Sequence, residues 1–298
     1  MQDPPAIDRL HPPVTLDTAH PPIRMSRREI MLGLAAGSIV AFTGCTYNAA
    51  LDRRQLMLVS QSQMNALSAR AWGDLKRQKK VSTEPQYATR LQTVGRRVTA
   101  AADMEHVDWE YVAFESEEKN AFVLPGGQVG FYTGMMDFVD NDAQLAAIMG
   151  HEVGHVRARH GAERYSQALA AQVGVTAASV AVAATDVDYG APAVAALGVG
   201  IQFGVLLPYS RRHELEADLI GLNYMTQAGY NPHQSVALWQ KMDAESKGFR
   251  PPKFMSTHPD AQTRIAALRR EIAAKGYQRR AKPLAPTPAG PLPPGSSP

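Results

Sequence analysis

Apolar and polar residues alternate along this chain with the periods of several helices and of one small sheet. Residues 51–80 and 86–102 carry apolar side chains at helical spacing among polar ones, so both segments are predicted to be amphipathic helices. Residues 107–114 alternate with the period of a strand. Residues 120–133 form a second extended segment, which the sequence Pro-Gly-Gly at 125–127 interrupts with a turn or bulge.

Three further helices have clear start or stop signals. Asn141 can cap a helix N-terminus with Gln at the third helical position, so a helix is expected from there through Arg159. Another is expected over residues 210–228, closed by Gly229, and a last one over residues 259–276. The predicted fold class is therefore α+β and mainly helical.

Two uncharged runs, residues 165–185 and 189–208, lie between the first two of these helices, and each is long enough to span a membrane. The first run has only five strongly apolar side chains, and their insertion would contribute only about −1.5 to −3 kcal/mol before its glutamines reduce that figure. Buried helices of a soluble domain are favoured, and a hairpin that dips into the membrane stays open.

Composition narrows the classes of protein to consider. The chain has 298 residues, 45% of them apolar, which is enough for one sizeable core. We predict one domain over residues 45–280, followed by a disordered tail at 281–298 that is rich in Pro, Gly, Ser and Ala. Lys and Arg number 31 against 28 Asp and Glu, and this small, dispersed excess argues against a nucleic-acid partner.

The single cysteine, Cys45, excludes an intramolecular disulfide and a cysteine-based metal site, but its position is informative. Residues 25–44 have a basic start and an uncharged stretch, Ile30–Gly44, which rises about 22 Å as a helix, short of a bilayer's roughly 30 Å hydrocarbon core. They are predicted to be a signal peptide. Phe-Thr-Gly-Cys at 42–45 resembles a lipobox, with Phe where Leu is usual. A lipid-modified Cys45 is expected; the alternative is a permanent membrane anchor with Cys45 buried.

Two details of the N-terminal region have more than one reading. Ser-Arg-Arg at 26–28 resembles a twin-arginine export signal, and an ordinary basic start of a signal peptide explains it equally well. Residues 1–24 are rich in Pro, which a signal peptide does not need, so Met25 is a candidate start and residues 1–24 a leader without structure. The predicted location is the periplasmic side of the cell envelope, with a lipid anchor in a membrane.

The candidate chemistry begins at residues 151–155, which read His-Glu-Val-Gly-His on a predicted helix. Four residues advance about 400° along a helix, so His151 and His155 lie on one face about 6 Å apart. That spacing suits two ligands of one tetrahedral zinc ion, and Glu152 lies beside this face as a candidate general base. The alternative is two surface histidines on a charged helix.

A separate predicted helix supplies carboxylates. Glu214 and Asp218 are four residues apart and therefore on one face of the helix over residues 210–228. Glu214 would complete a set of two His and one Glu around the metal. Asp218 can accept the outer N–H of a liganding histidine and fix its tautomer. The alternative for Glu214 is a solvated charge beside Arg211.

These motifs, in this order, resemble a known family. His-Glu-x-x-His at 151–155 and Ser-Arg-x-x-Glu-x-Glu-Ala-Asp at 210–218 are similar to those of the gluzincin metallopeptidases of the prenyl-protease, HtpX and Oma-type family, metallopeptidase family 48. The lipoprotein start resembles its periplasmic bacterial branch. The likeness runs from about residue 53 to 268, and further matching segments are residues 54–60, 120–127, 229–232 and 256–259, with Arg264.

The resemblance implies a gluzincin metallopeptidase domain whose small sheet lines the zinc cleft with an edge strand. It implies that Glu214, and not Glu216, is the third ligand. Asn120 and Ala121 are expected on the edge strand, where an extended substrate can bind by strand addition. His258 is expected either to stabilise the oxyanion or to bind the metal as a fourth ligand that displaces water, with a helix cap as the alternative. Other histidines lack evident partners and are interpreted as structural or surface residues: His106, His160, His213 and His233.

The predicted function is hydrolysis of peptide bonds with one zinc ion and Glu152 as general base. Unfolded or misassembled envelope proteins are the expected substrates, and this expectation rests on the resemblance alone. Two other classes stay open. One is an envelope assembly or chaperone-like factor with a latent zinc site, which His258 could close. The other is an integral membrane protease with residues 165–208 inserted.

Overall fold

The computed structural model describes residues 45–104, 106–183, 209–246, 248 and 252–277, and of residues 172–183 it describes the helical backbone alone. The predicted leader (1–24), signal peptide (25–44) and tail (281–298) lie outside these residues and stay predictions. The described strands are β1 (Cys45–Asn48), β2 (Arg53–Leu56), β3 (Glu110–Phe114), β4 (Ala121–Val123) and β5 (Gln128–Tyr132). The described helices are α2 (Gln61–Gln78), α3 (Pro85–Ala101), α4 (Thr133–Phe138), α5 (Asp142–Arg157), α6 (His160–Ala183), α8 (Arg211–Gln227), α9 (His233–Ser246), α10 (Phe254–Thr257) and α11 (Ala261–Ala274). The α+β, mainly helical fold class is confirmed.

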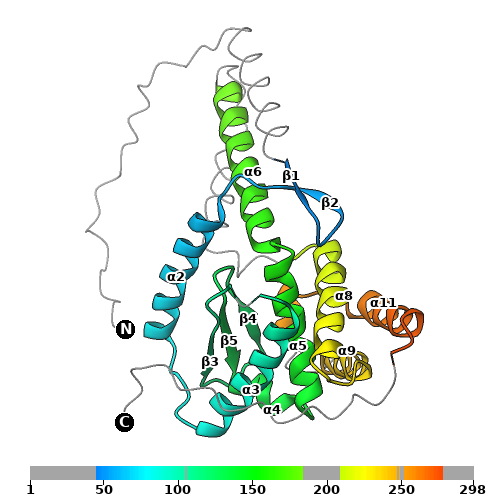
Figure 1. Cartoon of the computed structure of the whole chain (residues 1–298). Coiled ribbons are helices and arrows are strands. Elements are labelled where there is room, and N and C mark those ends of the chain that lie inside the picture. Colours follow the sequence, from blue (N-terminus) through cyan, green and yellow to red (C-terminus); the bar gives the residue numbers. More distant parts are fainter. Residues whose placement is uncertain (1–44, 105, 184–208, 247, 249–251, 278–298) are drawn as a thin grey trace, which may run out of the picture.

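Three strands form the sheet that borders the candidate site (Figure 1). Their order is β3-β5-β4, with β3 parallel and β4 antiparallel to β5. The turn between β4 and β5 contains Gly127 at a φ of +95°, a conformation that favours glycine. The predicted interruption at residues 125–127 is therefore a tight hairpin turn, and β4 is an edge strand, as predicted.

Side chains alternate between the two faces of this sheet, and each face has its own cover. Phe114, Phe122 and Tyr132 point to one face, where Trp72 of α2 packs against the rings of Phe114 and Phe122. The neighbouring residues Ala113, Ala121, Val123 and Phe131 belong to the larger core, which includes α3, α5, α8, α9 and α11. Figure 1 shows α2 and α5 on opposite sides of the sheet.

The two helices with the candidate motifs begin where the sequence predicts. The side chain of Asn141 accepts a hydrogen bond from the backbone N–H of Gln144, and that of Ser210 accepts one from the N–H of His213. The first of these helices, α5, ends before the predicted Arg159. That residue has a φ of +56°, which a right-handed helix cannot include.

The helix predicted over residues 51–80 is wrong at its N-terminal end. Residues 53–56 form β2, which pairs with β1 in an antiparallel hairpin. The helix α2 starts only after Ser60, where Ser60 and Gln63 form a capping box with reciprocal side-chain bonds. Apolar spacing alone did not locate this start, because the strand gains its stability from a partner and not from its own pattern.

The first uncharged run forms the greater part of α6, which extends past the other described elements in Figure 1. Ser166 is buried, but Gln167, Ala170 and Ala171 are exposed, so the expected burial is wrong for this stretch. The second run, 189–208, lies outside the described residues. Within the described chain, no helix combines the length and the apolar character needed to cross a membrane.

The helices α5 and α8 touch through their backbones. A Cβ atom added to Gly150 would lie 2.6 Å from the carbonyl oxygen of Gly221, and one added to Gly154 would lie 2.7 Å from that of Ala217. Both distances are shorter than side-chain atoms tolerate, so only glycine permits this approach. These two backbone contacts, at Gly150 and at Gly154, hold residues 151–155 against residues 214–218.

We expect Gly221→Ala to destabilise the fold by about 1–3 kcal/mol, because the added methyl group would force α5 and α8 apart. The free energy of unfolding, measured in urea, checks this. The matched control is Gly73→Ala in α2, where the nearest atom is the flexible end of Arg77 at 3.4 Å. A helical Gly→Ala change without a clash stabilises by about 0.4–1 kcal/mol. Equal effects of the two substitutions would contradict the backbone contact.

Candidate metal centre

Four buried side chains converge on one point next to the contact of α5 and α8. They are His151 and His155 of α5, Glu214 of α8, and His258, which directly follows α10, and one ligand atom of each lies within 4.8 Å of the others. His258 is placed by its backbone N–H, which donates to the carbonyl of Phe254, and by stacking of its ring on the Phe254 ring at 4.2 Å. The last helix, α11, is capped by Asp260, so His258 is not its cap.

The spacing of the three predicted ligands fits a tetrahedral ion. Nε2 of His151 lies 3.1 Å from Nε2 of His155 and 3.5 Å from Oε2 of Glu214, and Nε2 of His155 lies 3.4 Å from Oε1 of Glu214. Two donor atoms that each bind a tetrahedral zinc ion at about 2.0–2.1 Å lie about 3.3 Å apart. The residues present therefore fit a divalent metal ion bound by nitrogen and oxygen.

His258 lies close to two of the three predicted ligands. Its Nδ1 is 3.1 Å from Nε2 of His151 and 3.1 Å from Oε1 of Glu214, similar to the 3.1–3.5 Å between the other ligand atoms. Its Nε2 lies 3.5 Å from Oε1 of Glu152. This ring is thus between the candidate ligands and the candidate base.

Burial sets the protonation of the candidate ligands. It lowers the pKa of His151 to about 4 and the pKa of His155 well below its ordinary value, so both imidazoles are neutral, the form that binds a metal. Burial alone would raise the pKa of Glu214. The nearby His258 and Arg264 outweigh that effect and hold the Glu214 pKa well below its ordinary value, so this carboxylate is ionised.

The outer nitrogen of His151 faces the predicted partner. Nδ1 of His151 lies 2.9 Å from Oδ1 of Asp218. Arg264 pairs with this carboxylate, with Nε and Nη2 each 2.6 Å from an Asp218 oxygen, and its Nη2 also lies 2.9 Å from Nδ1 of His151. Its Nη1 lies 2.7 Å from Oε2 of Glu214. The guanidinium also stacks on Trp239 at 3.5 Å. From the sequence, Arg264 was a motif position without a role, because its partners lie on another helix.

The outer nitrogen of His155 faces another histidine. Nδ1 of His155 lies 2.9 Å from Nδ1 of His160, and Nε2 of His160 lies 2.9 Å from Oε2 of Glu216. His213 is also buried and pairs with Glu163 at 3.1 Å. The interpretation that His160 and His213 lack partners is therefore wrong. The five-residue separation of His155 and His160 was the only local signal in the sequence for the contact between these two histidines.

Two other histidines and Glu216 lie as the sequence indicated. His106 is exposed and His233 is half-buried, and neither is among the four converging side chains. Glu216 also lies outside that group, because its carboxylate turns toward Arg53, Arg212 and His160.

Glu152 lies between the four converging side chains and the edge strand β4. It is 2% exposed, and the backbone N–H of Val123 donates to its carboxylate. Its Oε1 is buried without a hydrogen-bond partner, which is costly unless a ligand or water supplies one. Burial raises the pKa of Glu152 to about 7. The carboxyl group is thus suited to accept and return a proton near neutral pH.

The predicted substrate-binding residues lie at the start of the edge strand. Ala121 is buried and Asn120 is half-buried. The carbonyl of Asn120 and the N–H of Leu124 bond to β5, so the N–H groups of Ala121 and Val123 point to the free edge. Within the chain, the Asn120 side chain accepts from Ala121 and the Glu152 carboxylate accepts from Val123.

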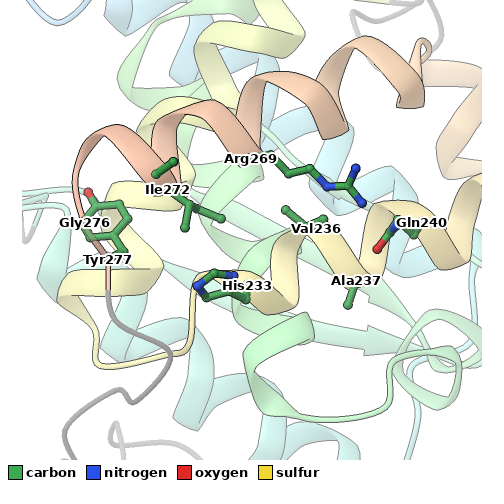
Figure 2. A pocket seen from close by; sticks show the side chains of 9 residues that line it. His233, Val236, Ala237, Gln240, Arg269, Ile272, Gly276 and Tyr277 are labelled. Atoms are coloured by element: carbon green, nitrogen blue, oxygen red, sulfur yellow. The ribbon is translucent and has the colours of Figure 1, made fainter.

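A separate groove of about 430 Å³ lies between α9 and α11 (Figure 2). None of the candidate site residues lines it, and Arg269 and His233 are its basic side chains. It therefore adds nothing to the chemistry of the four converging residues.

Comparison with known proteins identifies the class. Residues 85–272 match the family described as peptidase family M48. Over 241 residues the chain is 33% identical to the mitochondrial metalloendopeptidase OMA1 of Schizosaccharomyces pombe, covering 79% of this chain and 68% of that protein. Over 191 residues it is 27% identical to the beta-barrel assembly-enhancing protease of Escherichia coli K12, covering 62% of this chain and 39% of that protein. Over 269 residues it is 29% identical to the mitochondrial metalloendopeptidase OMA1 of Bos taurus, covering 84% of this chain and 51% of that protein.

A helical domain with a His-Glu-x-x-His helix and a carboxylate from a second helix defines a metallopeptidase. This chain belongs to peptidase family M48. The resemblance found in the sequence is thus confirmed. The alignments reach only about half or less of some of these relatives, so features of their remaining parts do not carry over.

We expect Asp218→Asn to weaken metal binding about 10–100-fold, because the amide no longer provides the carboxylate that orients His151 and pairs with Arg264. The dissociation constant, from competition with a chromophoric chelator, checks this. Asp74→Asn in α2 is the control, since Asp74 pairs only with Arg77 on the exposed surface of the described chain. The assigned role of Asp218 is wrong if the two variants bind metal equally well.

Proposed function

We propose that this chain is a zinc-dependent endopeptidase of the cell envelope. In this proposal His151, His155 and Glu214 hold one zinc ion and Glu152 is the general base. The supporting observation is the tetrahedral spacing of the three ligands, 3.1–3.5 Å between donor atoms, beside a buried Glu152 oxygen that lacks a partner. Neutral imidazoles and an ionised carboxylate are the donor set that catalytic zinc sites use.

A zinc ion held by His151, His155 and Glu214 would supply Lewis acidity to the substrate carbonyl and to the attacking water. Glu152 does the proton transfer: its Oε1 accepts the proton of the attacking water and then donates it to the leaving amine nitrogen. A pKa of about 7 suits both directions, because neither protonation state is strongly favoured at neutral pH. The N–H of Val123 keeps the carboxylate in place while Oε1 faces the reaction.

The proposed substrate is an extended segment of an unfolded or misassembled envelope protein. An edge strand beside the base can bind such a segment by strand addition, with Asn120 and Ala121 as the contacts. The proposed anchor is a lipid on Cys45, the residue at which β1 begins. The names of two relatives support protein substrates, since one is a beta-barrel assembly-enhancing protease and the other a mitochondrial metalloendopeptidase.

The position of His258 favours fourth-ligand binding over oxyanion stabilisation. Its Nδ1 lies 3.1 Å from donor atoms of both His151 and Glu214, so it takes the corner that a water needs. A zinc site with four protein ligands is closed. In this arrangement the enzyme is latent, and hydrolysis requires the His258 ring to leave. The same observation supports a second candidate function, an assembly or chaperone-like factor whose zinc stays closed.

We expect Glu152→Gln to keep zinc binding and to lower kcat about 10²–10⁴-fold, because the amide cannot accept a proton. Zinc stoichiometry and casein hydrolysis, each with and without a chelator, check both parts. Glu84→Gln, at the exposed N-terminus of α3, is the control with the same change of charge. Peptidase activity that persists in Glu152→Gln would refute the general base.

We expect His258→Ala to weaken zinc binding at least about 10-fold and to raise hydrolysis per bound zinc, because the fourth corner becomes open to water. Zinc titration and casein hydrolysis of the same preparation separate the two effects. His233→Ala on α9 is the control. If the zinc affinity is unchanged and kcat falls about 10²–10³-fold, His258 instead stabilises the oxyanion.

A further inference from the structure

A buried polar network joins the first hairpin of the described chain to the outer side of His155. We name it the Arg53 network, and its members are Arg53, Gln55, His160, Glu163, His213 and Glu216. It brings together β2, α6 and α8 at the outer nitrogen of His155, whereas Asp218 lies at the outer nitrogen of His151. Hydrolysis as proposed above uses none of these side chains.

We propose that Arg53 and His160 are positioning residues for the zinc ligand His155, so that the N-terminal hairpin is part of the support of the metal centre. This inference rests on the proposed zinc site. It follows from the direction of the hydrogen bonds, from the pairing of Arg53 and from the place where the hairpin attaches.

With Nε2 of His155 bound to the proposed zinc, the hydrogen bonds assign one tautomer to each of two histidines. The His155 proton is then on Nδ1, which donates to Nδ1 of His160 at 2.9 Å. His160 must accept there, so its own proton is on Nε2, which donates to Oε2 of Glu216 at 2.9 Å. Each ring then has one tautomer only. A histidine that binds metal needs such an outer partner to hold its orientation.

Arg53 holds the carboxylate at the end of this chain. Its guanidinium contacts Glu216 through Nε and Nη2, both at 2.8 Å, and Glu163 through Nη1 at 2.7 Å and Nη2 at 2.8 Å. The Arg53 side chain is only 10% exposed. Without it, two largely buried carboxylates would lie close together with less compensation, and Glu216 would keep only the exposed Arg212 as a basic side-chain partner beside His160 within the described chain.

The hairpin is attached where α5 ends, three residues after His155. Nε2 of Gln55 and Nδ2 of Asn48 both donate to the carbonyl oxygen of Ala158, at 2.8 Å and 3.0 Å. Gln55 also donates to Glu163 at 2.6 Å. The hairpin thus fixes the C-terminal end of the metal-binding helix and the start of α6 together, and a displacement of Arg53 is transmitted to His160 and His155.

The test compares Arg53→Met with Arg54→Met in the full chain. Both remove one positive charge from β2, but the Arg54 side chain is exposed and lies outside the network. We expect Arg53→Met to weaken zinc binding about 10–100-fold and to change the visible spectrum of the cobalt-substituted protein. Arg54→Met should leave the zinc affinity within about twofold and the spectrum unchanged, as expected for a surface side chain.

A second pair changes the acceptor itself. His160→Gln keeps a side-chain acceptor for Nδ1 of His155, whereas His160→Leu removes it at similar size. We expect the leucine variant to weaken zinc binding about 10–100-fold, and the glutamine variant to recover most of that loss. This pair decides the question if Arg53→Met does not fold, because both variants keep Arg53 and its two carboxylates.

Unfolding of the metal-free variants separates positioning from a purely structural role. The inference is overturned if Arg53→Met or His160→Leu lowers the melting temperature of the metal-free protein but keeps the wild-type zinc affinity and cobalt spectrum. Wild-type protein that binds neither zinc nor cobalt overturns the proposed site itself. Wild-type protein that binds zinc and cleaves casein, with all four variants unchanged, overturns this inference alone.

Discussion

The contact of two helix backbones at Gly150 and Gly221 is the constraint on which the site depends. The candidate ligands of α5 lie 3.4–3.5 Å from Glu214 of α8 where these helices approach more closely than a Cβ atom permits. Gly154, inside the His-Glu-x-x-His motif, repeats the contact against Ala217 one turn further on. Since close-packed interiors do not deform smoothly, the approach is fixed by sequence and not by the metal.

The close approach gathers acidic and basic groups that must be balanced without water. Two arginines do this, and each bridges two carboxylates. Arg264 pairs with Asp218 and Glu214, and Arg53 pairs with Glu216 and with Glu163 through two bonds each. Asp218 supports His151 directly, whereas Glu216 supports His155 through an intervening imidazole. The helix α8 therefore orients both candidate histidine ligands, His151 by a direct contact and His155 through His160.

Local signals in the sequence were sufficient for the helices α5 and α8 and for the turn before β5, whereas the edge strand, the choice of Glu214 and the role of His258 came from the family resemblance. Caps at residues 141 and 210, a turn at 125–127 and the four-residue spacings in α5 and α8 each depend on neighbours in the chain. The strand at 53–56 depends on pairing with β1 a few residues before it, which its own apolar spacing does not reveal, so Arg53 was placed in a helix. The supporting arginines depend on carboxylates 46 to 163 residues away, and no spacing rule encodes such pairs.

The edge strand and the general base are not independent parts of the site. In β4 the N–H groups of alternate residues face the free edge, and the one at Val123 already holds Glu152. In the proposed strand addition, a peptide can replace the Asn120 side chain at the N–H of Ala121, but the N–H of Val123 is already bonded to Glu152. This bond would limit the register of the added peptide and would place its backbone beside the candidate base. Substrate alignment and base placement would then depend on the same three-residue strand.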